Sequence, residues 1–437
     1  MRNRLIKAIA FLAIPFAAFA MSSNTYAEDG TLYYFGISNG SEECYFFDNH
    51  YGSITECSPE YGSFDNDTRI FTMGSCLNEN THIIIHGNSP VTIKTTRNIN
   101  IAGIDYSPFE GNIILDLGDY RLNAKRIILD TITVQSGLLS VRGDNSDTEA
   151  NDIVINNLII NGGKVSINDS FASKKTTMNN GELEATGFIA LSNALYVNGG
   201  RYVHNSSSLN CRTISNTIIN TNGEIETNCM LEFIGNYDEV RLIIEGGKTV
   251  VRQDRSNDMP AIYSSKGSIE VSGGELTVTA KEGYSGPAIV TWGGGIRITG
   301  GKTTVYGASF GMRAKNDIVF NGGTTTIHNS LLYPVYTESN ITLGEKMVIM
   351  PEDLSIQTTP EASFIPIAET VTILKNGDKE EDNSDESDIK VPDTGTINSK
   401  EGGALAIFAV STAVILAIIG FGSYIKNRNK DHYVFDK

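Results

Sequence analysis

The chain has 437 residues, of which 19% are charged, and a formal net charge of −17 at pH 7. Residues 1–27 carry a net +3 and residues 396–437 a net +2, so the portion between them has a charge of −22. This acidic balance excludes nucleic acid as a partner, because phosphate backbones are bound by clustered lysine and arginine. It also disfavours acidic glycans, unless a cation bridges the two negative charges.

Residues 1–27 have the organisation of a secretory signal peptide. Basic residues precede an apolar run from Ala8 to Met21, and a short polar stretch then ends at Ala27. The run is shorter than the roughly 20 residues that a membrane-spanning helix needs. We therefore expect the chain to be exported and cleaved after Ala27.

Residues 28–110 are rich in tyrosine and aspartate and contain no Gly-Gly pair. We interpret them as an N-terminal cap with the first strands of the domain that follows. Their three cysteines, Cys44, Cys57 and Cys76, belong to an exported chain in which disulfides can form. The odd number predicts one pair and one free thiol, and the sequence leaves the pairing open.

Residues 111–351 repeat a unit of two short alternating strands that meet at a Gly-Gly or Asn-Gly pair. The clearest copies are residues 269–278, 296–305 and 318–327. The second residues of the pairs stand at positions 163, 181, 200, 223, 247, 274, 301 and 323, which gives a repeat of about 23 residues. Such a repeat predicts a solenoid, because stacked copies bury a core that no single copy can bury.

A third short strand recurs at residues 260–262, 287–289 and 334–335. Three strands per turn of about 23 residues predict an all-β protein, a right-handed parallel β-helix whose apolar columns face inward. The glycine pair suits a corner, where the bend needs a positive φ or a residue without Cβ. A β-propeller is the alternative, but its blades need about 40 to 50 residues and four strands.

The isoleucine-rich pattern around the glycine pairs, from about residue 152 to residue 351, resembles the bacterial carbohydrate-binding β-helix proteins of the pectate-lyase-like superfamily. The resemblance covers a little under half of the chain. It implies an extracellular protein that is associated with calcium and binds glycans without catalysis.

Three aromatic residues beside the third strand form the candidate glycan-binding site: Tyr263, Tyr284 and Trp292. Aromatic rings can stack on the faces of sugars, and the stacking of coils would bring these rings to one side of the solenoid. The alternative is that they are ordinary residues on the solenoid rim. Further tyrosines in the last repeats are Tyr306, Tyr333 and Tyr336.

A candidate calcium site lies in the acidic loop at residues 143–152. Its oxygen ligands would be Asp144, Asp147, Glu149 and Asp152. Carboxylates at this spacing in a loop suit Ca²⁺, although the spacing is not that of an EF-hand. A loop whose charges are simply solvated is the alternative, and we expect no other cofactor.

Two further cysteines, Cys211 and Cys229, lie 18 residues apart, which is close to one turn of the repeat. Adjacent coils would bring them together, so we expect them to form a disulfide. His204 occupies a position where other repeats carry valine or isoleucine, and we interpret it as a core or strand-end residue.

The sequence shows no clear set of catalytic residues. A polysaccharide lyase needs a basic residue beside a carboxylate cluster, but Arg297 and Arg313 are isolated at outward strand or loop positions. A glycoside hydrolase needs two carboxylates roughly 5 to 10 Å apart, and stacked coils could create such a pair from Glu270 and Glu275. We expect no enzyme activity. The alternatives are a polysaccharide lyase or hydrolase on the same fold, and a surface structural or host-contact protein that binds a protein partner.

Residues 352–375 are expected to cap the far end of the solenoid. Residues 376–390 form a charged run without aromatic residues. Such a run cannot bury enough apolar surface to fold, so we interpret it as a disordered acidic stalk.

Residues 391–437 combine a pentapeptide, an apolar helix and a basic tail. Residues 402–425 carry no charge and are followed by lysine and arginine, as expected for a membrane-spanning helix with its basic side inside. The pentapeptide before the helix is Val391-Pro392-Asp393-Thr394-Gly395. In this order the three parts resemble the LPxTG cell-wall sorting signal of bacteria.

The resemblance implies that a sortase cleaves between Thr394 and Gly395 and joins the Thr394 carboxyl group to an amine of peptidoglycan. Val391 replaces the leucine of that signal, and the tail at residues 426–437 is longer than usual. A plain membrane anchor through residues 402–425, with a short cytoplasmic tail, is therefore the alternative. In either case we expect a cell-surface, non-catalytic carbohydrate-binding or adhesin-like protein with a polysaccharide or glycan ligand.

Overall fold

The computed structural model describes residues 32–39, 42–48, 55–105, 111–142, 153–168, 170–207, 212–234, 242–253, 259–281 and 286–376. These residues belong to one compact unit, Ala18–Asp378. The predicted signal peptide at 1–27, the sorting motif at 391–395 and the membrane helix at 402–425 lie outside the described residues. Within the described part of the chain, no helix is long and apolar enough to cross a membrane.

The described residues form 29 strands and no helix. In chain order the strands are β1 (Leu32–Ser38), β2 (Glu43–Asp48), β3 (Gly62–Asp65), β4 (Ile70–Met73), β5 (His82–Lys94), β6 (Ile99–Asp105), β7 (Gly111–Val141), β8 (Ile153–Ile160), β9 (Lys164–Ile167), β10 (Phe171–Met178), β11 (Glu182–Ala185), β12 (Ile189–Val197), β13 (Arg201–His204), β14 (Arg212–Asn220), β15 (Glu224–Thr227), β16 (Met230–Phe233), β17 (Leu242–Ile244), β18 (Lys248–Gln253), β19 (Ile262–Ser264), β20 (Ile269–Val271), β21 (Glu275–Ala280), β22 (Pro287–Thr291), β23 (Ile296–Ala314), β24 (Ile318–Thr337), β25 (Ile341–Leu343), β26 (Met347–Met350), β27 (Gln357–Thr358), β28 (Ser363–Ile365) and β29 (Thr370–Lys375).

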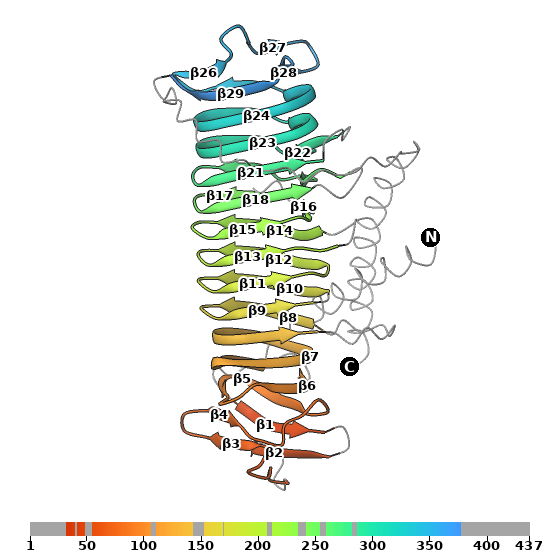
Figure 1. Cartoon of the computed structure of the whole chain (residues 1–437), viewed down its shortest axis with the longest axis vertical. Coiled ribbons are helices and arrows are strands. Elements are labelled where there is room, and N and C mark those ends of the chain that lie inside the picture. The colour runs from red at the N-terminus through yellow and green to blue at the C-terminus, as the bar shows by residue number, and fades with distance from the viewer. Residues whose placement is uncertain are drawn as a thin grey trace, which may run out of the picture. The chain divides into compact units, whose positions relative to one another are not determined.

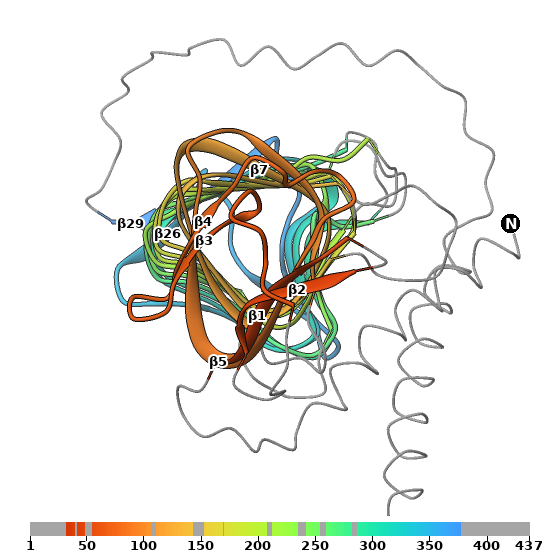
Figure 2. The same cartoon turned by 90° about the horizontal axis from the view of Figure 1, so that it is seen from below.

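The strands wind into a parallel β-solenoid of about ten turns, with about 23 residues in each coil (Figure 1). Every coil contributes to three sheets. Sheet A holds the segment before the glycine corner, sheet B the segment after it, and sheet C the short third segment. In one coil these are residues 158–160, 164–167 and 171–173, each of which pairs in parallel with its counterpart in the next coil. Seen along the axis, the coils superimpose around a common centre (Figure 2).

The glycine pairs stand at the corner between sheets A and B. A Cβ on Gly273 would collide with the carbonyl oxygen of Glu245 in the preceding coil. Gly274 has φ +65°, a conformation that residues with a side chain rarely adopt. The first glycine is therefore required by the close approach of two coils, and the second by the left-handed turn.

The core consists of inward-facing columns of aliphatic side chains. Val251, Val278, Val305 and Ile327 lie in register on successive strands of sheet B, and each is at least 99% buried. Alternation along each strand sends the intervening side chains outward. The prediction of a parallel solenoid with apolar inward columns is confirmed.

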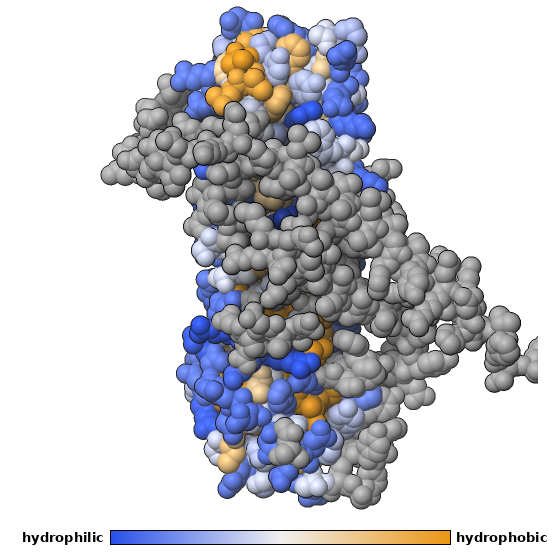
Figure 3. Space-filling view, turned by 90° about the vertical axis from the view of Figure 1, so that its right-hand side faces the viewer, coloured by the Kyte–Doolittle hydropathy of each residue, from blue (hydrophilic) through white to orange (hydrophobic). Residues whose placement is uncertain are grey.

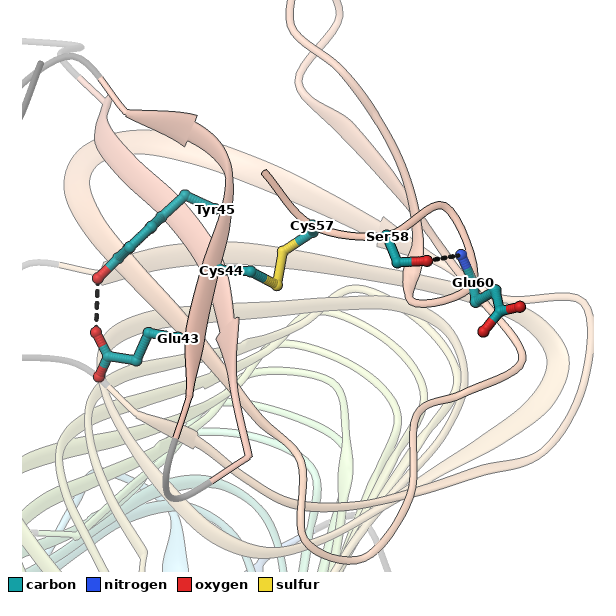
Figure 4. The surroundings of a disulfide bond; sticks show 6 residues. All are labelled: Glu43, Cys44, Tyr45, Cys57, Ser58 and Glu60. Atoms are coloured by element: carbon teal, nitrogen blue, oxygen red, sulfur yellow. Dashed lines mark hydrogen bonds between the residues drawn. A yellow bond between two sulfur atoms is a disulfide. The ribbon is translucent and has the colours of Figure 1, made fainter. Parts of the chain in front are cut away.

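The N-terminal end is closed by the antiparallel strands β1 to β3. The parallel ladder begins at the pairing of β4 with β5, inside the segment interpreted above as a cap with first strands. A disulfide joins Cys44 in β2 to Cys57 beyond it, with the two Cα atoms 4.8 Å apart (Figure 4). Cys76 is a free thiol, so the pairing that the sequence left open is resolved.

The C-terminal end is closed by a reversal of strand direction. β28 and β29 pair antiparallel with β24, and β26 pairs antiparallel with β29. This arrangement covers the last edge of the parallel ladder, which would otherwise expose unpaired backbone groups.

Candidate functional site

The outward side of sheet C carries the candidate binding site at its C-terminal end. Four residues occupy the same register position on successive coils, namely Tyr263 in β19, Val290 in β22, Arg313 in β23 and Tyr336 in β24. Neighbouring strands are about 4.8 Å apart, so each side chain can contact those in the coils before and after it.

Arg313 lies among three aromatic rings. Its guanidinium carbon is 4.4 Å from the centroid of the Trp292 ring and 5.5 Å from the centroids of the Phe310 and Tyr336 rings. These distances are within the range of cation–π attraction. The rings fix a planar guanidinium group at the surface of sheet C.

The aromatic residues around Arg313 also contact one another. The ring centroids of Phe310 and Tyr336 are 5.5 Å apart, and those of Tyr333 and Tyr336 are 5.9 Å apart. Tyr333 reaches Phe364 in the C-terminal cap, with 4.7 Å between centroids. We call Trp292, Phe310, Arg313, Tyr333 and Tyr336 the aromatic–arginine cluster.

Polar contacts leave part of the guanidinium group available. Arg313 Nη2 lies 3.4 Å from Glu338 Oε1, and the Arg313 side chain is 25% exposed. Arg313 Nε is buried, so a ligand could reach only the N–H groups of Nη1 and Nη2. Because arginine has five N–H donors, the cluster combines flat apolar rings with donors that a ligand hydroxyl could engage.

The predicted glycan-binding residues are distributed as follows. Trp292 follows β22 and donates its backbone N–H to Ser264 O, so it stands one coil beyond Tyr263. Its ring contacts Arg313, which lies two register steps from Tyr263. Burial raises the pKa of Tyr263, with a smaller contribution from the negative charge of Glu232. Tyr284 lies outside the described residues.

Arg313 and Phe310 are the residues of this site that sequence reasoning missed. We interpreted Arg313 above as an isolated outward arginine, whereas it lies at the centre of the cluster. The third strand was recognised by its proline, but Phe310 stands where the preceding coil has Pro287. Without this proline, the sequence did not show that Arg313 aligns with Val290 and Tyr336 of the neighbouring coils.

The other predicted sites lie largely outside the described residues. This applies to the candidate calcium ligands Asp144, Asp147, Glu149 and Asp152, to the sorting motif Val391–Gly395, and to Cys211. Cys229 is buried and disulfide-bonded, and its pairing with Cys211 stays a prediction. Among the residues that are described, no group of histidine, cysteine and carboxylate side chains could hold a metal ion.

Carboxylates on the outward side of sheet B are engaged in ion pairs. Glu182 and Glu184 contact Lys164, and Glu226 contacts Arg201 and Arg252. Glu270 lies in register with Arg297 on sheet A, whereas Glu275 lies on sheet B beyond the glycine corner. The residues considered for hydrolysis thus stand on different sheets.

A second polar cluster lies near the N-terminal end of sheet C. The Asp105 carboxylate contacts His82 Nδ1 and lies 3.1 Å from Arg126 Nε. A Cβ on Gly103 would lie 3.2 Å from His82 Nδ1, so the imidazole lies close against the β6 backbone. Because the three side chains come from β5, β6 and β7, the cluster ties the first coils together.

Comparison with protein-family models, with curated proteins and with solved structures found no match.

Proposed function

We propose that the protein is a non-catalytic carbohydrate-binding protein of the bacterial cell surface, and that the aromatic–arginine cluster is its binding site. The carrying observation is the position of Trp292, Arg313 and Tyr336, which come from three coils and present rings and N–H donors together. Aromatic rings can pack against the C–H faces of a sugar, while arginine donors can bind its hydroxyl groups.

The surface charge favours a neutral glycan. The chain carries −17 overall, so an acidic polysaccharide would be repelled at long range. A neutral sugar meets no such barrier. The local charge also suits it, because Glu338 lies 3.4 Å from the Arg313 guanidinium group and offsets its positive charge.

Location supports the same proposal. The signal peptide at residues 1–27 would export the chain, and a sortase acting at Thr394, or a membrane anchor at 402–425, would retain it. A surface protein that holds a polysaccharide needs a rigid scaffold, and a solenoid core supplies one.

A glycan array probed with the chain carrying Trp292→Ala tests the proposal. We expect binding of neutral oligosaccharides that falls about tenfold or more in the variant, because the ring that contacts the sugar is lost. Tyr120→Ala is the matched control, since Tyr120 is exposed at the other end of the solenoid. Binding that is equal in the wild type and in Trp292→Ala would remove this site.

A second candidate function is contact with a protein partner. Leu331 and Leu332 lie in β24, directly before Tyr333 of the aromatic–arginine cluster, and are 57% and 47% exposed. Figure 3 shows apolar side chains gathered near the C-terminal end of the solenoid on the side that it displays. Exposed apolar patches are typical of interaction surfaces. A wild-type protein that binds no glycan on the array would favour this candidate.

A further inference from the structure

The outward side of sheet B changes in character along the solenoid. In the middle coils it carries ion pairs, such as Lys164 with Glu182 and Arg252 with Glu226. In the sheet B segments of β21, β23 and β24, the outward side chains after the first position are uncharged at neutral pH. They are Thr277, Thr279, Thr304, Tyr306, Thr326 and His328, which we call the threonine–tyrosine face.

Two rings form a stack within this face. Tyr306 and His328 lie in register on β23 and β24, with centroids 4.7 Å apart and planes inclined by only 8°. Thr370 Oγ1 in the C-terminal cap lies 3.1 Å from His328 Nδ1. The imidazole is thereby fixed from one side, and it holds the Tyr306 ring flat although Tyr306 is 38% exposed.

On the other side of the Tyr306 ring, the described residues that lie in register with it have side chains that are short or turned away. The preceding coil has the short side chain of Thr279 at this position, and the coil before that has Arg252. Arg252 Nη1 lies 2.8 Å from Glu226 Oε1 on β15, which directs its guanidinium group away from Tyr306. Two strand spacings are about 9.5 Å, whereas a stacked ring needs only about 3.5 to 4.0 Å from its partner.

Hydroxyl groups border this space. Thr304 is two residues before Tyr306 and faces the same side, and Thr277 occupies the same register position one coil earlier. Residues two apart on a strand are about 6.7 Å apart, so a sugar seated on the Tyr306 ring could reach both hydroxyl groups. Burial lowers the pKa of His328, which favours the neutral imidazole.

We propose that the open face of Tyr306 is a second binding site, which takes a neutral pyranose between Tyr306 and the Thr279 position. The inference rests on the proposed glycan-binding function, but not on the site proposed for it, because the aromatic–arginine cluster belongs to sheet C. Its ligand class follows from a stacking ring, flanking hydroxyl groups and uncharged side chains. Two sites on different sheets would let one molecule hold two sugar segments, which raises avidity without new contacts.

Isothermal titration calorimetry on the purified full chain tests the inference. The probes are β-1,4-linked gluco-, xylo- and manno-hexaose. For the hexaose that binds, we expect two sites on each wild-type chain. Tyr306→Ala should remove one site and leave the affinity of the other unchanged, because the two sites share no residue. Tyr306→Phe should keep both sites, since the stacked ring is retained. Tyr120→Ala, which removes a tyrosine of similar exposure, should also keep both.

The outcomes separate this inference from the proposed function. If Trp292→Ala abolishes binding and Tyr306→Ala changes nothing, the second site is refuted while the aromatic–arginine cluster stands. If Tyr306→Ala removes all binding and Trp292→Ala none, the second site stands and the cluster is not a binding site. If no neutral hexaose binds the wild type, both proposals are wrong for this ligand class.

Discussion

Lowering the pH from 7 to 4 should loosen the solenoid around His204. This imidazole is fully buried, and it forms a hydrogen-bonded chain with Tyr202 and Thr213. His204 Nε2 lies 2.7 Å from Gly187 O and must donate, because a carbonyl oxygen only accepts. His204 Nδ1 then accepts from the Thr213 hydroxyl, so a second proton on the ring would require this hydroxyl to turn its own proton toward Tyr202.

The size of the effect follows from the two pKa values. Burial lowers the pKa of His204 from 6.5 to about 4, and the hydrogen bond to Gly187 O opposes this only in part. Between these values the unfolded chain binds a proton that the folded chain does not. Stability is therefore complete above pH 6.5 and falls as the pH drops toward 4. At about 1.4 kcal/mol for each pH unit, the loss reaches about 3 kcal/mol.

Hydrogen exchange measures this loss locally, because solenoids can open segment by segment. The perturbed amides should be those of β12 to β14, after correction for the intrinsic exchange rate at each pH. His204→Val is the matched variant, since other coils carry valine or isoleucine at this position. It should be less stable at pH 7, because Gly187 O loses its donor, but should lack the decline between pH 6.5 and 4. Equal declines in the two proteins would refute the argument.

Two further predictions concern the backbone and the cross-link. Gly274→Ala should destabilise the solenoid by about 2 kcal/mol or more, because its φ is +65° and the new Cβ would lie 2.5 Å from the Gly246 carbonyl carbon. Gly118→Ala, with a similar φ of +62° and open space around its Cβ, should cost only about 1 to 2 kcal/mol in urea denaturation, and equal costs would contradict the close approach of coils. Replacing Cys44 and Cys57 by serine should lower stability by about 3 kcal/mol, since the disulfide closes a loop with a sequence separation of 13. Cys76→Ser should leave the melting temperature unchanged, and a drop as large as that of the double variant would show that the thiol, not the disulfide, is needed.

The interior of the solenoid could be predicted from the sequence because two regularities, one within each strand and one between coils, fix which residues face inward. Alternation in each strand sends Val278 and Val305 inward, and repetition of the coil places them in register. The same reasoning placed His204 at a core position, which its complete burial confirms. The beginning of the solenoid was harder to locate, because its first corners lack the Gly-Gly pair, and the parallel ladder is already present at β4.

The candidate sites could be predicted only in part. Trp292 and Tyr306 were recognisable as aromatic residues in the last repeats. Their neighbours were not, because Arg313 and His328 do not recur at the equivalent positions of the adjacent coils and leave no pattern in the chain. The two aromatic residues also proved to belong to different faces, Trp292 beside sheet C and Tyr306 on sheet B.

The sequence by itself determined the coil, since burying a core obliges the inward positions to be apolar and the corners to be glycine. Only the tertiary structure decided which outward side chains become neighbours. Outward positions can hold almost any residue type. Because the coils differ in length, the number of residues between equivalent outward positions of successive coils also varies. Trp292 meets Arg313 because two coils of particular length stack, and Tyr306 has an open face because Arg252 turns toward Glu226.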